Sequence, residues 1–203
     1  MKLRLGVLLT ALLMFSVQAF AATQAANAST VSPTLKISVT VQKAIQLTLS
    51  TGSQCTVSAG SGTDYQMTFG TVDALGISTP TCGSVYAPTT PGVSPSVYYT
   101  DYKLTPAFSG QTTTLGGTVT AYVSTNFTNP TVLAVVQSNT TPASIASLTA
   151  MSTAPATPTS VGTTVVSGTA ITRYIGVQVS VQNNASPFTA GDSAIVTYTL
   201  TAP

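Results

Sequence analysis

Apolar and polar residues alternate strictly in several short segments of this chain. The alternation runs through residues 35–42, resumes over 45–50 and returns over 194–200. A period of two residues is typical of β-strands that bury one face. Further short apolar segments of this kind follow at 54–58, 65–69, 98–108, 119–123, 132–137 and 171–181. The pattern therefore predicts about eight or nine strands.

Proline, glycine and small polar residues mark the predicted breaks between these strands. Residues 79–96 contain four prolines and two glycines, which predicts an irregular loop. Pro106 lies inside an alternating segment, so we expect an edge strand or a break there. Residues 138–164 are dominated by Ser, Thr, Ala and Pro, and we expect a loop. The spacing of Ile145, Leu148 and Met151 leaves one short helical turn open as an alternative.

No segment of helical period interrupts the predicted strands. This favours a single antiparallel β-sandwich over a fold that alternates strands and helices. We expect a leader at 1–21, an N-terminal extension at 22–43 and one sandwich domain at 44–203.

The leader has the three parts of a secretory signal peptide. Lys2 and Arg4 precede an apolar run at 5–15, which is too short to span a bilayer. Small residues follow, and we expect cleavage after Ala21 or after Ala28. An uncleaved membrane anchor is the alternative interpretation. We expect an exported chain, in the periplasm, at the cell surface or outside the cell, with no later transmembrane segment.

Charged residues are scarce. The 203 residues include 6 Lys and Arg, 4 Asp, no Glu and no His. Without the leader, four cations face four aspartates, so the net charge of the mature chain is zero. Because the chain has no histidine, it cannot form a Ser-His-Asp triad, a Cys-His dyad or a metal site that contains His. Its few positive charges also disfavour binding to a nucleic-acid backbone. We expect a non-enzymatic protein with no cofactor and no metal.

Two cysteines and two tyrosines are the remaining candidates. Cys55 and Cys82 are the only cysteines, and in an exported chain we expect them to form a structural disulfide. This disulfide would close the loop between the two cysteines and stabilise the folded state by about 3–4 kcal/mol. Tyr86 and Tyr99 are weak candidates for glycan contacts, because tyrosine rings stack on sugars.

The order of several short motifs resembles a known family. A leader, the alternating segment 34–42, a strand with Cys55, the element Met67-Thr68-Phe69-Gly70, Cys82 and a Gly191-Asp192 turn before a final alternating strand follow one another. This order resembles subunits of archaic chaperone–usher pili and the related spore coat protein U domain. The middle of the chain, 85–166, is longer and richer in proline than that pattern.

The resemblance implies an immunoglobulin-like, pilin-like sandwich that lacks its last strand. A segment from another subunit would then fill the gap by strand addition. The donor side chains would be Leu35, Ile37, Val39 and Val41, and Val196, Tyr198 and Leu200 would lie near the acceptor edge. Partners would be copies of the chain or related subunits, with a periplasmic chaperone and an usher. The alternative is that 35–41 is an ordinary first strand of a self-complete adhesion or carbohydrate-binding module.

Overall fold

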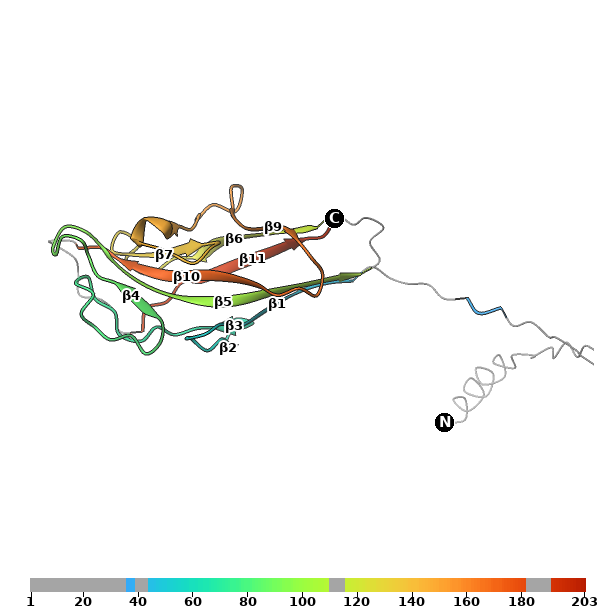
Figure 1. Cartoon of the computed structure of the whole chain (residues 1–203), viewed down its shortest axis with the longest axis horizontal. Coiled ribbons are helices and arrows are strands. Elements are labelled where there is room, and N and C mark those ends of the chain that lie inside the picture. Colours follow the sequence, from blue (N-terminus) through green and yellow to red (C-terminus); the bar gives the residue numbers. More distant parts are fainter. Residues whose placement is uncertain (1–35, 39–43, 110–115, 182–190) are drawn as a thin grey trace, which may run out of the picture. The chain divides into compact units, whose positions relative to one another are not determined.

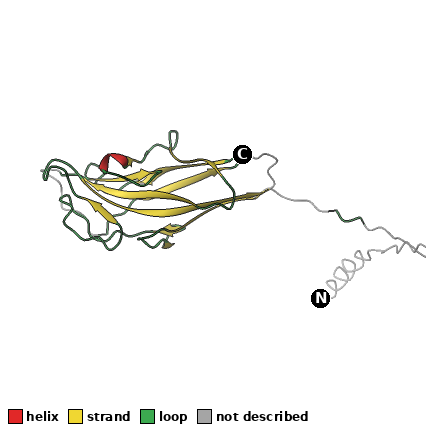
Figure 2. Ribbon diagram, in the orientation of Figure 1, coloured by secondary structure: helices red, strands yellow, loops and turns green. Residues whose placement is uncertain are grey.

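The computed structural model describes residues 36–38, 44–109, 116–181 and 191–203. Residues 36–38 belong to a separate N-terminal unit, 1–40, and carry no regular secondary structure. The other described residues form β-strands and one 3-10 turn, without an α-helix (Figure 2). This confirms the prediction of an all-β chain with antiparallel sheets packed together.

The longest strand of the larger sheet is β5, which pairs with β1 and β4 along one edge and with β10 along the other (Figure 1). Its strands follow the order β1-β5-β10-β7-β8, each antiparallel to its neighbour, and β4 pairs with β5 beside β1. The bounds are β1 Ala44–Thr51, β4 Ser84–Tyr86, β5 Ser96–Ser109, β7 Leu133–Ser138, β8 Thr149–Ala150 and β10 Ile171–Val179.

The smaller sheet has three strands in the order β11-β6-β9, again antiparallel. A separate short hairpin joins β2 to β3. The bounds are β2 Ser58–Ala59, β3 Tyr65–Gln66, β6 Gly117–Thr125, β9 Thr159–Val165 and β11 Ile195–Thr201.

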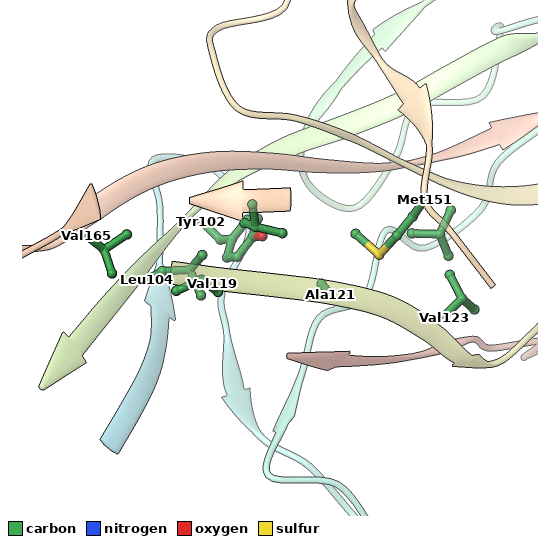
Figure 3. Packing of buried hydrophobic residues seen from close by; sticks show 9 residues of the cluster. Tyr102, Leu104, Val119, Ala121, Val123, Met151 and Val165 are labelled. Carbon is green, nitrogen blue, oxygen red and sulfur yellow. The ribbon is translucent and has the colours of Figure 1, made fainter. Parts of the chain in front are cut away.

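The main core lies between the two sheets (Figure 3). Alternate residues of β5 and β6 point into it, among them Tyr102, Leu104, Val119 and Ala121, all nearly inaccessible to solvent. The period-two pattern in the sequence therefore corresponds to inward and outward faces of real strands.

A second, smaller apolar cluster covers part of the outer face of the larger sheet. Val97, Val136 and Leu148 form it, and the 3-10 turn Ile145–Ser147 lies over this face. The helical alternative in the segment 138–164 is thus realised as a single short turn. The rest of that segment was expected to be a loop, yet it contains β8 and most of β9.

One side of the sandwich is closed by chain that passes from one sheet to the other. The Met151 amide donates to the Val135 carbonyl (2.9 Å) beside β7, and the Val123 amide of β6 donates to the Ser152 carbonyl (2.8 Å). Arg173, on β10, donates through its guanidinium to the Val161 carbonyl of β9. The two sheets are therefore linked along this side by hydrogen bonds as well as by packing.

Pro106 lies within β5, which continues through it. Pairing with β10 ends at Leu104, so beyond that point β1 is the only strand partner of β5 among the described residues. The Pro106 carbonyl accepts from the Gly168 amide (2.7 Å), on the side away from β1. Because the N–H and C=O of one strand residue point to the same side, the missing N–H also faces away from the ladder. The residue is tolerated because it lies at a local edge.

Candidate functional site: the open side

The side of the sandwich opposite the crossing segment is bounded by two edge strands. In the part of the chain that the structure describes, β1 pairs only with β5, and β11 pairs only with β6. Ala44 lies opposite Ser109 and Thr201 opposite Thr118, so β1 begins at the end of the sandwich where β11 ends. We call this region the open side, defined by β1 and β11.

Apolar side chains of both edge strands reach the core but remain partly exposed. They pack against the main core cluster without being fully buried, and they are Leu47 and Leu49 of β1 and Val196, Tyr198 and Leu200 of β11. At the two ends Ile45 is 55% exposed and Ile195 is 40% exposed. The core is therefore incompletely covered along the open side.

A tyrosine pair connects β11 to the larger sheet beneath the open side. The Tyr198 hydroxyl donates to the Tyr102 hydroxyl at 3.0 Å, and the rings meet edge to face at 6.1 Å. Burial raises the pKa of Tyr102 to about 12 and raises the pKa of Tyr198 well above its usual value. Both hydroxyls are therefore protonated at neutral pH. The hydrogen bond between them fixes the position of β11 relative to the larger sheet.

The two edge strands lack the usual protection against unwanted pairing. Neither AIQLTLST in β1 nor IVTYTLT in β11 contains a charged residue or a proline. Exposed edges in monomeric proteins usually carry such residues, because bare backbone groups attract another strand. The open side thus presents an apolar row between two unguarded edges.

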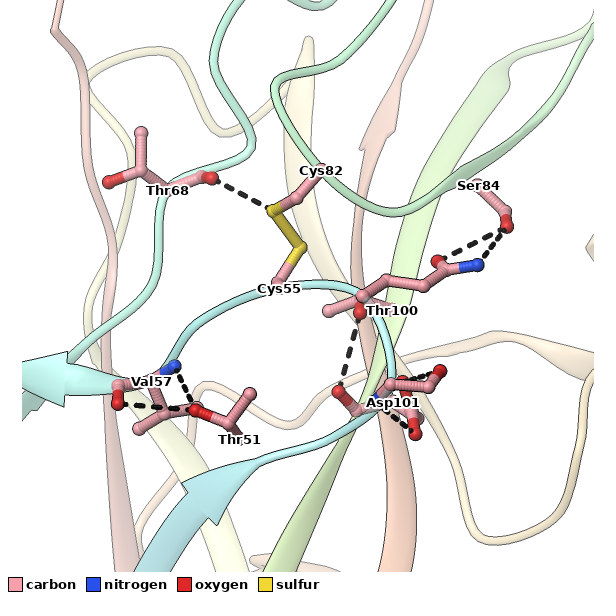
Figure 4. Close-up of a disulfide and its surroundings, with 10 residues drawn as sticks. Thr51, Cys55, Val57, Thr68, Cys82, Ser84, Thr100 and Asp101 are labelled. Atoms are coloured by element: carbon pink, nitrogen blue, oxygen red, sulfur yellow. Dashed lines mark hydrogen bonds between the residues drawn. A yellow bond between two sulfur atoms is a disulfide. The ribbon is translucent and has the colours of Figure 1, made fainter.

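The predicted disulfide is present between Cys55 and Cys82, with Cα atoms 5.0 Å apart (Figure 4). It lies just beyond the end of β1 and indicates an oxidising compartment. Ser53, in the same loop, donates its amide to both carboxylate oxygens of Asp101, at 2.8 and 2.9 Å. The chain leaving β1 is therefore anchored by a covalent bond and by hydrogen bonds to β5.

The proposed donor residues are mostly outside the described part of the chain. This applies to Leu35, Val39 and Val41, whereas Ile37 is described and is 79% exposed. The proposed acceptor residues Val196, Tyr198 and Leu200 all lie on β11, on its core-facing side.

The two glycan candidates face each other. The rings of Tyr86 and Tyr99 stack at 4.9 Å between centroids, and the Tyr86 hydroxyl donates to the Pro142 carbonyl at 3.0 Å. Both the ring and the hydroxyl of Tyr86 therefore already have partners within the protein. Tyr99 also borders a polar hollow, together with Tyr174, which the sequence analysis did not single out.

Three of the four aspartates organise loops. Asp73 accepts from the amides of Leu75 (2.7 Å) and Ser78 (2.5 Å), and Asp192 accepts from the Thr128 amide at 3.1 Å. Burial raises the pKa of Asp73, but the hydrogen bonds from Ser78, Leu75 and Ile77 outweigh it and hold this pKa far below its usual range. None of the aspartates is among the candidate site residues predicted from the sequence. A local sequence signal exists for Asp73, whose carboxylate accepts from amides two and five residues further along the chain. Ser53 and Thr128, in contrast, lie far in sequence from Asp101 and Asp192.

The described residues contain no group of three or more His, Cys, Asp or Glu that could hold a metal. Within the same residues no helix is long and apolar enough to cross a membrane. No protein-family model, no curated protein and no solved structure matches this chain significantly.

Proposed function

We propose that this protein is an exported, non-enzymatic structural subunit that assembles into a surface fibre or coat by β-strand addition. The observation that carries the proposal is the open side, where partly exposed apolar residues lie between two uncharged edge strands. An added strand would bury these side chains and satisfy the unpaired backbone groups of the edge. The resemblance to archaic pilus subunits and the spore coat protein U domain agrees with this mechanism, in an immunoglobulin-like sandwich that lacks one strand.

The segment 35–41 has the properties that an added strand needs. It is seven residues long, as is β11, and its apolar side chains occupy every second position. One face would enter the open side with Leu35, Ile37, Val39 and Val41, and the other would present polar residues to solvent. We infer that this segment is the donor.

The position of the segment in the chain favours addition to another copy. In its own sandwich, the segment would have to fold back onto β1 through Gln42 and Lys43 alone. It would then run antiparallel to β1 and parallel to β11, because these two strands run in opposite directions. A second copy is not limited by this short connection, and it can insert its segment antiparallel to β11 and parallel to β1. Such a head-to-tail contact does not close on itself and builds a filament.

The resemblance also suggests the partners and the location. We infer that the partners are copies of this chain or related subunits, with a periplasmic chaperone and an usher during export. The final location is the cell surface or the outside of the cell.

The test is the assembly state of the mature full-length chain, measured by size-exclusion chromatography with light scattering. We expect the wild type to assemble. Val39→Asp should abolish assembly, because it places a charge against the apolar row of the next copy. Thr40→Asp is the matched control, with the same charge on the opposite face of the segment, and should assemble. A wild type that is a stable monomer, or equal behaviour of the two variants, contradicts the proposal.

A further inference from the structure

A small hollow lies on the outer face of the larger sheet. Its volume is about 180 Å³, and its lining residues include Tyr99, Tyr174 and Asp101. Tyr99 and Asp101 are two residues apart on β5, and Tyr174 lies opposite Asp101 on β10, so the three share one face. Their neighbours of the other parity, Tyr98 and Tyr102, are buried on the inner face. The hollow therefore faces away from the smaller sheet.

The lining combines aromatic rings with neutral polar groups. Besides the tyrosines and Asp101, the lining residues are Ser53, Gln54, Ser84, Thr100 and Thr141. The described residues of the lining include no lysine or arginine, so nothing there would attract a phosphate or a carboxylate. Rings that offer apolar surface beside hydroxyl, amide and carboxylate groups match a sugar ring, which has C–H faces and a rim of hydroxyls.

The polar groups of the hollow are held in place by long-range hydrogen bonds. The Ser53 amide and hydroxyl both donate to Asp101, the hydroxyl at 2.7 Å. The Gln54 amide donates to the Ser84 hydroxyl at 3.1 Å. This loop is also anchored by the disulfide at Cys55. A carboxylate has about four acceptor sites, so Asp101 can still accept from a ligand hydroxyl.

The two tyrosines are fixed by contacts from different elements. The hydroxyls of Tyr174 and Thr141 lie 2.8 Å apart, and the Tyr99 ring rests on the ring of Tyr86. Burial, followed by the neighbouring Tyr86 hydroxyl, raises the pKa of Tyr99 to about 12, so its hydroxyl keeps its proton. Little ordering would be needed on binding, which favours affinity for a small ligand.

We propose that this hollow binds one neutral hexose unit of a glycan, with Tyr99 and Tyr174 contacting the ring, the Tyr174 hydroxyl forming a hydrogen bond with one sugar hydroxyl and Asp101 accepting from another. Tyr86 acts as a positioning residue that supports Tyr99. The site does not depend on strand addition, because the hollow lies on the face turned away from the smaller sheet. An assembled fibre would therefore present one such site per subunit.

Saturation-transfer difference NMR on the mature full-length chain tests the proposal, with methyl glycosides of glucose, galactose, mannose and N-acetylglucosamine as probes. We expect at least one probe to receive saturation, and Tyr174→Phe to weaken its binding up to ~10-fold through loss of one hydrogen bond. Tyr122→Phe, on β6 of the smaller sheet, is the matched control and should bind as the wild type does.

The same NMR measurement on the Val39→Asp variant separates this proposal from strand addition. Binding by that variant equal to that of the wild type supports a site independent of assembly. Failure of all four probes, or equal binding by Tyr174→Phe and the wild type, overturns the glycan site and leaves strand addition unaffected.

Discussion

The two long sides of the sandwich close in different ways. On one side, the segment 149–152 crosses between the sheets, and Arg173 on β10 reaches the carbonyl of Val161 on β9. On the other side, β1 and β11 face each other with no ladder between them in the described residues, and only the Tyr198–Tyr102 hydrogen bond links the sheets there. Both sides are rich in Thr and Ser, so composition does not separate them. The difference lies in whether the chain supplies its own covering strand.

The disulfide should give the largest single effect. Replacing both Cys55 and Cys82 with alanine removes the crosslink that anchors the chain leaving β1. We expect the free energy of unfolding to fall by about 3–4 kcal/mol, chiefly because the unfolded chain gains freedom. Urea denaturation of the double variant and the wild type measures this loss. A loss below ~1 kcal/mol would show that the open side does not rely on the crosslink.

A matched pair of core truncations compares the two sides directly. Met151, on the closed side, is 4% exposed, whereas Leu200, on the open side, is only partly buried. We expect Met151→Ala to lower the free energy of unfolding by about 2–3 kcal/mol, because it leaves a buried cavity. Leu200→Ala should lose only ~1 kcal/mol, since its side chain is still partly in water. These values apply to the monomeric Val39→Asp background, and equal losses would contradict the description of an open side.

Arg173 tests the hydrogen bonds that close the first side. Its guanidinium donates to the carbonyls of Val161 and Asn139. Arg173→Leu should lower the free energy of unfolding by about 1–2 kcal/mol, because those carbonyls lose their donor. Thermal unfolding followed by circular dichroism should show a decrease of several degrees. An unchanged melting temperature would mean that packing alone closes this side.

Tyr198→Phe is expected to give the smallest effect, about 1 kcal/mol, because it removes one hydroxyl–hydroxyl bond and keeps the ring. The burial of both hydroxyls, rather than the bond between them, predicts a pH dependence, and Tyr198→Phe removes one of the two groups. The pKa of Tyr102 is raised to about 12, so its contribution is complete below the unfolded value near 10 and is lost as the pH rises toward 12. Alkaline titration of stability should therefore show a loss in this window for the wild type. If the free energy of unfolding of Tyr198→Phe and of the wild type fell equally between pH 10 and 12, Tyr198 would not contribute to the pH dependence.

The long alternating strands could be predicted from the sequence, and some local features could not. The segments that became β1, β5, β6, β10 and β11 alternate clearly, because one face of each meets the core. The strand β9 was missed because only Val161 and Val165 of its seven residues are buried apolar side chains, within a run of Thr, Ser and Gly. The reverse error occurred at 65–69, where only Tyr65 and Gln66 pair as a strand. Periodicity detects one-sided burial, and it fails where a strand is covered by few large side chains.

Some residues of the candidate sites could likewise be predicted from the sequence, and others could not. Two cysteines, in a chain predicted to be exported, sufficed to predict the disulfide, because no other pairing within the chain was possible. Arg173 interrupts an apolar row in the sequence, and only the structure explains it, through carbonyl partners on β9. Tyr174 was not selected, because its place opposite Asp101 depends on the register of β5 and β10. Cross-strand neighbours are set by register, which one sequence does not specify.

Hydrogen exchange at the backbone amides of β11 tests the central claim most directly. In the assembled wild type, the β11 amides that point away from β6 should be protected, because a donor strand from another copy accepts from them. In the monomeric Val39→Asp variant, the same amides should exchange rapidly, while those bonded to β6 stay protected. Protection of the outward amides in the Val39→Asp monomer, or rapid exchange in the assembled wild type, would contradict the account.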